Sequence, residues 1–372
     1  MNATIQNPIE KLVATLDEQR ARKRDLILPA SKLKMTTSLN MEVSINDALG
    51  SSEYFAPNEL METQLAEKLG IPMNYYRKMK SVIPNLLTEN VNGWLDHNQS
   101  KKYLLRTFTN GEEIGTAIAF LSDRYNLIDN YDVLTASLDA INQTGVNVEV
   151  RKAEVSETKM YLHVVCPEVE QQAEEFLRGY LKDTGNAQGN GIISGFVITN
   201  SEVGKGAFEI RPRAVIVKCN NGLIVADEKF RKLHLGATLE PGEVVWSERT
   251  KQKNYELIIS QTKDAIKTYL SPEFLGNMIE KIARLNEIEL THPIDTVQNV
   301  CVELGISEQY RYNVISNFLK DGSGQNGLGI FQAVTREAQN MEIDKQDEVE
   351  QGIVPLLTSA NFLKKFDKIH KN

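Results

Sequence analysis

The spacing of apolar residues separates a helical start from a segment without a clear period. Four apolar residues near the start fall on one helical face: Ile9, Leu12, Val13 and Leu16. Residues 26–55 are rich in Ser, Thr and Asn and have no clear period, which indicates extended, partly docked chain. We therefore expect residues 1–55 to form an N-terminal arm.

Residues 56–100 have the pattern of a helical hairpin, with a first helix that ends at Gly70. The run QLAEKLGIPMNYYRKM also has a superficial likeness to a helix-turn-helix, whose second helix would enter a DNA groove. The residues presented there would be Asn74, Arg77, Lys78 and Lys80. Short helix-glycine-helix pairs are common, so we favour a hairpin that packs on a core.

From Lys101 the apolar pattern becomes that of strands. Asn110-Gly111 predicts one hairpin turn, and residues 146–155 and 160–165 predict a second hairpin. A helix is expected between the hairpins, and a further helix over 169–182.

Residues 101–240 thus form a central α+β core, and residues 241–372 a helical C-terminal region with helices such as 256–269 and 272–286. The expected fold class is α+β, with a central antiparallel, hairpin-rich sheet, helices, and the C-terminal helical region.

Composition places the chain among soluble proteins of the cytoplasm. It contains no run of 18 apolar residues, so no membrane-spanning helix and no membrane partner are expected. Its three cysteines lie far apart and form no metal or redox motif, which is typical of reduced thiols. The net charge of −8 argues against a uniformly basic DNA binder, because such proteins are normally basic.

The charge is uneven, and residues 195–236 have the densest combination of glycine turns and basic residues. Gly204 and Gly206 flank Lys205 in a turn that could leave backbone N–H groups and an ammonium free for an anion. It is not a Walker A loop, because Thr199 stands five residues before Gly204, where the first glycine of that motif would be needed. A second turn is expected at Asn221-Gly222, and acidic residues cluster separately at 342–350.

Arg211 and Arg213 lie two apart on an expected strand, so they point to the same side and could hold successive phosphates. A solvated sheet face with Glu209 as their partner is an equally good interpretation. The nucleic-acid-binding residues expected from this stretch are Lys205, Arg211, Arg213, Lys218, Arg231 and Lys232.

Four sequence blocks resemble a phage- and plasmid-encoded family known as domain of unknown function nine hundred and thirty-two. They are LGIPMNYYRKM with NVNGWL, LRTF with AIAFLSDRYNLIDN, NSEVGKGAFEIRPRAVIVKCNNGL with KLH, and GIFQAVTREAQ. The chain has Cys219-Asn220-Asn221-Gly222 where the family often has Cys-Thr-Asn-Gly. The resemblance implies a mobile element in a bacterial host cell, and it implies no activity, catalytic residue or cofactor.

Catalytic motifs are sparse. The five histidines have no metal-binding spacing, and no GxSxG elbow is present, so no catalytic residue, metal or cofactor is assigned. A nuclease could use Asp123, Glu202 or Glu209 with Lys205 or Lys218, but their spacing does not differ from that of ordinary surface charge.

The favoured function is a non-catalytic nucleic-acid-binding protein of a phage or mobile element, for single-stranded DNA binding or annealing, which forms homo-oligomers. Annealing proteins have β-hairpin cores with a following helix, which is an analogy of fold. The alternative is a protein-interaction or assembly factor, in host takeover or anti-defence, favoured by the net charge and the helical C-terminal half. A nuclease or other hydrolase is the third interpretation.

Overall fold

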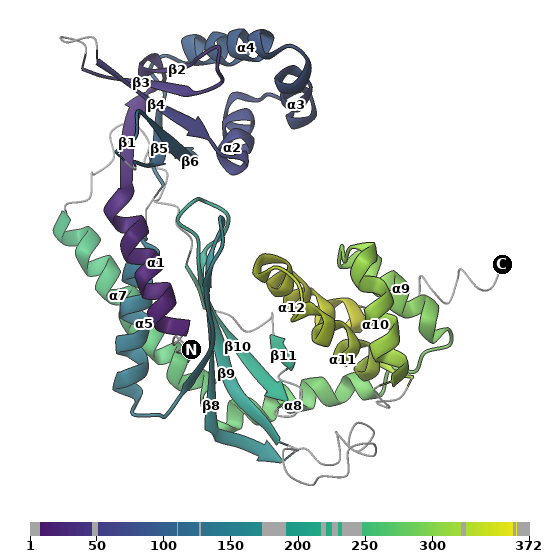
Figure 1. The fold of residues 1–372 in the computed structure, drawn as a ribbon. Coiled ribbons are helices and arrows are strands. Elements are labelled where there is room, and N and C mark those ends of the chain that lie inside the picture. The colour runs from purple at the N-terminus through teal and green to yellow at the C-terminus, as the bar shows by residue number, and fades with distance from the viewer. Residues whose placement is uncertain are drawn as a thin grey trace, which may run out of the picture. The chain divides into compact units, whose positions relative to one another are not determined.

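The computed structural model describes residues 8–46, 51–109, 111–125, 128–172, 191–216, 221–224, 230–232, 248–320, 325–359 and 362. The expected α+β class is confirmed, with helices and two β-sheets (Figure 1). The chain forms two compact units that alternate along the sequence. Unit 1 comprises Met1–Asp132, Ser201–Ala207 and Leu233–Val245, and unit 2 comprises Val133–Asn200, Phe208–Lys232 and Trp246–Asn372. These boundaries differ from the four consecutive segments expected from the sequence.

Unit 1 is built on a mixed sheet with the strand order β1-β5-β6-β4-β3-β2. The strands are β1 (Lys23–Pro29), β2 (Leu33–Met35), β3 (Met41–Asn46), β4 (Ser51–Pro57), β5 (Lys102–Phe108) and β6 (Ile114–Ser122). β4 and β6 run parallel, and the other pairs in this sheet are antiparallel.

The expected separate arm of residues 1–55 is therefore corrected, because most of residues 23–57 belongs to this sheet. The first helix ends at Arg22, and the chain continues directly as β1 from Lys23. Leu26 and Leu28 alternate there and pack against the apolar core of unit 1.

The helices of unit 1 are α1 (Pro8–Arg22), α2 (Glu59–Leu69), α3 (Met73–Val82) and α4 (Pro84–His97). The Asn58 side chain caps α2, and Gly70 ends it with a φ of 72°. Tyr76 and Met79 of α3 are buried with Phe120 of β6, so the hairpin packs on a core as favoured. Pro84 begins a third helix that the sequence pattern did not separate from the second.

Unit 2 contains an antiparallel sheet with the order β11-β10-β9-β8-β7, and β12 also pairs with β10. The strands are β7 (Glu149–Val155), β8 (Met160–Gln172), β9 (Gly191–Asn200), β10 (Phe208–Ile216), β11 (Asn221–Ile224) and β12 (Phe230–Lys232). The single sheet expected from the sequence is thus two sheets. Residues 169–172 were expected to begin a helix, but they extend β8 after a register shift between Cys166 and Glu170, and residues 173–182 lie outside the described residues.

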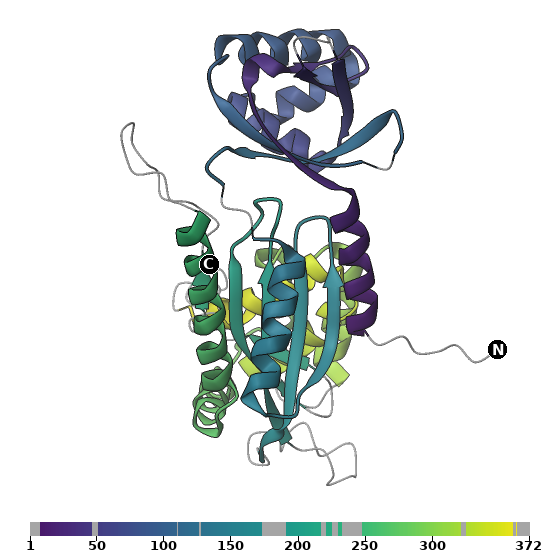
Figure 2. The ribbon, with the colours of Figure 1, turned by 90° about the vertical axis from the view of Figure 1, so that its left-hand side faces the viewer.

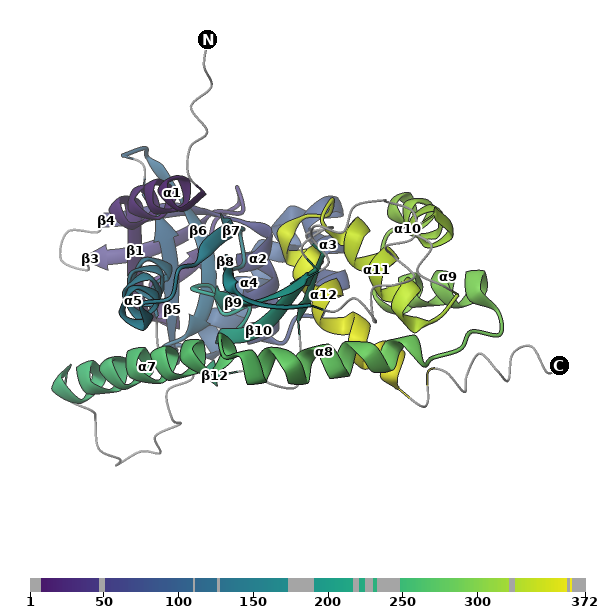
Figure 3. The ribbon, with the colours of Figure 1, turned by 90° about the horizontal axis from the view of Figure 1, so that it is seen from below.

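Helices cover both faces of this sheet. Figures 1 and 2 show α5 (Asn130–Thr144) and α7 (Glu248–Tyr269) on one side of it. Figures 1 and 3 show α11 (Gly327–Ala338) and α12 (Ile343–Thr358) on the other side. Among the described residues, no helix is both long and apolar enough to cross a membrane.

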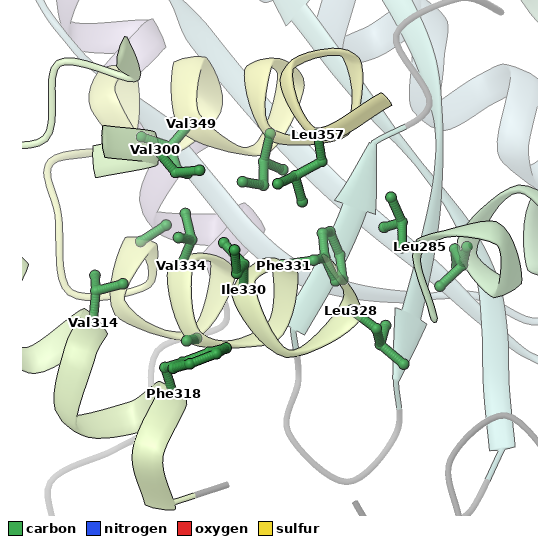
Figure 4. Close-up of a cluster of buried hydrophobic side chains, with 14 of the residues drawn as sticks. Leu285, Val300, Val314, Phe318, Leu328, Ile330, Phe331, Val334, Val349 and Leu357 are labelled. Carbon is green, nitrogen blue, oxygen red and sulfur yellow. The ribbon is translucent and has the colours of Figure 1, made fainter. Parts of the chain in front are cut away.

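The C-terminal helices have an apolar core of their own. It also includes α8 (Pro272–Asn286), α9 (Pro293–Glu303) and α10 (Glu308–Lys320). Figure 4 shows Phe331 and Val334 on the side of α11 that faces α12, with Leu357 of α12 facing the same core, and Val314 and Phe318 of α10 below α11. The expected helical C-terminal region is confirmed, and α12 contributes one apolar edge to it.

Candidate functional site

The opposite edge of α12 meets a polar face of the unit 2 sheet. Arg211 of β10 lies opposite Val197 of β9, which in turn lies opposite His163 of β8, so these side chains share one face. Alternation along β10 places Arg213 on that face as well. We call this group the polar layer: Lys152, Tyr161, His163, Glu209, Arg211 and Arg213 on the sheet, with Asp344, Gln346, Asp347 and Glu350 on α12.

Two buried ion pairs join α12 to β10. Arg211 Nη2 donates to Asp347 Oδ1 over 2.7 Å, and Arg213 Nη2 donates to Glu350 Oε1 over 3.2 Å. The four side chains are exposed by 3% or less. Each guanidinium meets the carboxylate of α12 through one nitrogen, so neither pair has the two parallel hydrogen bonds of the strongest arginine–carboxylate geometry.

The start of α12 is held by hydroxyl groups of the β7–β8 hairpin. Asp344 accepts hydrogen bonds from Tyr161 (2.7 Å), Ser156 (2.8 Å) and Thr158 (2.6 Å). Burial raises the pKa of Tyr161, and Asp347 and Asp344 raise it further, so its hydroxyl stays protonated and donates.

Glutamine side chains connect the remaining charges. Gln346 accepts a hydrogen bond from Lys152 Nζ at 2.6 Å and donates one to Glu350 Oε1 at 2.6 Å. Gln339 donates to the same Glu350 oxygen at 2.8 Å. A single carboxylate oxygen therefore serves three donors, which include Arg213.

Several buried donors in the polar layer have no hydrogen-bond partner among the described residues. They are Arg211 Nε and Nη1, Arg213 Nε, and whichever nitrogen of His163 carries its proton. Arg211 Nε has Glu209 Oε2 at 3.6 Å, an ion pair that is too long for a hydrogen bond. Among the carboxylate oxygens of the two ion pairs with α12, Glu350 Oε2 also has no hydrogen-bond partner among the described residues. Such buried groups normally bind water or a ligand, since an unmet buried donor costs about 1–3 kcal/mol.

His163 is a neutral imidazole in this setting. Complete burial lowers its pKa well below the ordinary value of 6.5, and the nearby charges of Arg213, Lys152 and Arg211 lower it further. The polar layer therefore offers fixed cations with unmet donors beside an uncharged ring. This arrangement is suited to binding an anion.

These positions correct the expected solvent-facing arginine pair. Arg211 and Arg213 share a face as predicted, but that face is buried and their nearest partners lie on α12. The partners stand 136 and 137 residues away in the sequence. The acidic cluster at 342–350 was the available signal, because Asp344, Asp347 and Glu350 recur along one helical edge.

Lys205 belongs to unit 1 rather than to the sheet of the two arginines. It is exposed in the turn after β9, and its backbone N–H donates to Ser201 Oγ at 2.9 Å. That amide is therefore already used within the turn. Gly204 has a φ of 75°, and a Cβ there would lie 2.7 Å from Leu121 Cδ2, so the predicted glycine turn is present and depends on Gly204. Gly206 lies in the same turn.

The second expected turn does not lie at Asn221-Gly222. Asn221 and Gly222 are the first residues of β11, opposite Ile216 and Val215, because the apolar run after them pairs with β10. Lys218 lies outside the described residues. Arg231 and Lys232 form part of β12, opposite Glu209 and Phe208, and their side chains lie outside the described part of the chain.

The carboxylates of the nuclease interpretation belong to different units. Glu209 lies in unit 2, while Glu202 lies in unit 1 and accepts hydrogen bonds from Lys23 (2.6 Å) and Arg106 (3.2 Å). Asp123 is exposed at the end of β6. The described residues contain no group of three His, Cys, Asp or Glu side chains arranged to hold a metal.

The partners of Glu202 form a second ionic cluster, in unit 1. Arg106 is fully buried and makes a bidentate pair with Asp25 at 2.7 and 2.8 Å. It also contacts Asp129 at 3.1 Å. Burial alone would raise the pKa of Asp129, but Lys23 and Arg106 outweigh it and lower that pKa. Because its charges are closely paired, this cluster stabilises unit 1 and has less unmet capacity than the polar layer.

Searches for related proteins found no matching family model, curated protein or solved structure. The resemblance to the phage and plasmid family therefore stays a prediction.

Proposed function

We propose that the protein is a non-catalytic nucleic-acid-binding protein, with single-stranded DNA as the favoured ligand, and that the sheet side of the polar layer binds the phosphates. One observation carries the proposal: the cations Lys152, Arg211 and Arg213 gather on one sheet face with guanidinium donors left unmet. A phosphate offers several acceptor oxygens to a guanidinium, whereas each carboxylate of α12 now receives one nitrogen.

The composition of the face favours a flexible strand over a rigid duplex. Tyr161 and the neutral ring of His163 lie beside the cations, and aromatic side chains stack on unpaired bases for roughly 1–3 kcal/mol per base. The order of four antiparallel strands, β7 to β10, with the later helix α7 also fits the hairpin-and-helix plan of annealing proteins. A phage or mobile-element context comes from the sequence resemblance alone.

Fluorescence anisotropy with a labelled oligothymidine tests the proposal. Contacts from three cations predict that log K falls with log salt at a slope of about −2, since each phosphate on a single strand contributes about −0.7. The double variant Arg211→Gln/Arg213→Gln should lose most of the binding and flatten the slope. Arg284→Gln is the control, because Arg284 is an exposed cation of α8. No binding to the wild-type protein or to any variant at low salt would refute the proposal.

A second candidate, a protein-interaction or assembly factor, is favoured by apolar side chains that face solvent. Tyr312 and Leu319 of α10 are 79% and 63% exposed and lie seven residues apart, on one helical face. Light scattering and pull-down without nucleic acid test this candidate. A stoichiometric protein partner, or a homo-oligomer that Tyr312→Ser and Leu319→Ser dissociate, would support it, and a monomer without a partner would refute it.

A further inference from the structure

We infer that the acidic edge of α12 is an internal competitor for nucleic acid, which occupies the cationic sheet face until phosphates displace it. This inference rests on the proposed function and adds regulation to the same site. It follows from the charges, from the two unlike edges of α12, and from the way that the C-terminal helices are attached to the sheet.

The acidic edge has the charge and spacing of a ligand for the face that it covers. Asp344, Asp347 and Glu350 recur every three residues, so their Cα atoms rise about 4.5 Å per step along one side of the helix. Asp347 and Glu350 meet successive arginines of β10, and Asp344 takes the hydroxyl donors at the end of the β7–β8 hairpin. The helix thus presents anions in a row, as a phosphodiester chain does.

The two edges of α12 are held by different forces. Val349, Ile353 and Leu357 pack into the apolar core with α11 and the other C-terminal helices. The sheet-facing edge contributes ion pairs and hydrogen bonds instead. Buried ion pairs recover little more than their cost of desolvation, and a polyanion that supplies the same charges can replace them. The polar contacts are therefore the ones that an anionic ligand would exchange.

Release of the acidic edge leaves the apolar attachment of the helices intact. Ile192 of β9 and Ala214 of β10 belong to the same apolar cluster as α8 to α12. Ala214 follows Arg213 on the strand, so it points to the opposite face of the sheet, where Ile192 also lies. The C-terminal helices therefore stay connected to the sheet through that face when the acidic edge of α12 leaves the polar face.

While α12 lies on the sheet, some buried donors of the polar layer have no hydrogen-bond partner. This favours the replacement of α12 by an anionic ligand. Among the described residues, Arg211 Nη1 and Arg213 Nε have no acceptor while α12 is in place. A phosphate group could pair with two nitrogens of one guanidinium and satisfy a donor that α12 does not reach.

Neutral variants of the acidic edge provide the test. Asp347→Asn/Glu350→Gln keeps the shape of both side chains and removes the competing charges. Its affinity for the labelled oligothymidine should be about tenfold higher than that of the wild-type protein, because the apparent affinity rises with the fraction of molecules that have the face free. Glu348→Gln is the matched control, since Glu348 lies on the same helix with a side chain that is 66% exposed, and its affinity should equal that of wild type.

The outcomes separate the two claims. If the wild-type protein binds the oligothymidine and the double variant binds no more tightly, the competitor role of α12 is wrong and the proposed function stands. If neither protein binds at low salt, the proposed function fails, and the inference fails with it. If circular dichroism shows that the double variant does not fold, Asp347→Asn alone carries the test, with an affinity expected between those of wild type and the tenfold gain.

Discussion

Arg211 on β10 and Asp347 on α12 form an ion pair of 2.7 Å in which neither side chain is exposed by more than 1%. The pair fixes a helix near the end of the chain to β10, in a sheet whose first strand begins almost two hundred residues earlier. Arg211, which the sequence suggested as a cation that binds a ligand, is thus paired with a carboxylate of the same chain.

Removing one member of this pair should destabilise unit 2 strongly. Asp347→Ala leaves a guanidinium buried without its carboxylate, and we expect the free energy of unfolding in urea to fall by about 3 kcal/mol. Glu348→Ala, at an exposed site on the same helix, should change it by less than about 0.5 kcal/mol. The apolar double variant Arg211→Met/Asp347→Leu should recover most of the loss. An Asp347→Ala protein as stable as wild type would show that the two groups are not paired in solution.

His163 should make the protein sensitive to acid. Its pKa in the folded protein lies below the ordinary value of 6.5, so the unfolded chain binds the proton first as the pH falls. The stability that the neutral His163 ring contributes to the folded protein is therefore fully present above about pH 6.5. Below that pH the free energy of unfolding falls by up to about 1.4 kcal/mol per pH unit.

The variant His163→Gln should remove this sensitivity. Between pH 6.5 and pH 5 we expect it to lose less stability than wild type in urea titrations. His97→Gln, at an exposed site in α4, should follow the wild-type curve. Parallel curves for His163→Gln and wild type would contradict a neutral, buried His163.

Gly204 should tolerate no side chain. Gly204→Ala combines a positive φ with a Cβ 2.7 Å from Leu121 Cδ2, so we expect a loss of at least about 1–2 kcal/mol in thermal or urea unfolding. Gly93→Ala is the comparison, because Gly93 lies within α4 and a Cβ there meets nothing within 4 Å. That change should be neutral or stabilise by up to about 1 kcal/mol. Equal effects at the two positions would contradict the turn geometry.

Arg106 should contribute more to the stability of unit 1 than any other charged side chain described there. Arg106→Gln leaves Asp25 and Glu202 without their shared guanidinium, and we expect a loss of about 3 kcal/mol or more. Lys102→Gln, at the exposed start of the same strand, should have little effect. Chemical denaturation followed by circular dichroism measures both, and a mild Arg106→Gln variant would mean that the cluster is solvated.

Local patterns predicted the elements better than their assembly. The helical spacing of Leu60, Leu65 and Leu69, and the left-handed Gly70 after them, located α2 because these signals act within a few residues. The strand character of 23–29 was missed because its charged residues pair with side chains from distant segments: Lys23 with Glu202, and Arg24 with Glu53. Neither contact leaves a periodic signal in β1 itself.

The sequence predicted only part of the candidate site, because local patterns carry no information about contacts between distant segments. Alternation along β10 placed Arg211 and Arg213 on one face, which depends only on strand geometry. Their burial depends on α12, and no local pattern relates Asp347 to Arg211 across 136 residues. Two unlike charge clusters, one basic and one acidic, were visible in the sequence, and their complementarity could have suggested that they meet.

Hydrogen–deuterium exchange of α12 tests the central claim most directly. In wild-type protein at low salt, the amides of 343–358 should exchange faster when saturating oligothymidine is bound, because α12 then loses one of its two packed edges. The amides of α11, which is buried on most of its sides, serve as the internal reference and should not change. Bound oligothymidine that leaves the exchange of α12 unchanged or slows it would contradict the displacement of its acidic edge from the sheet.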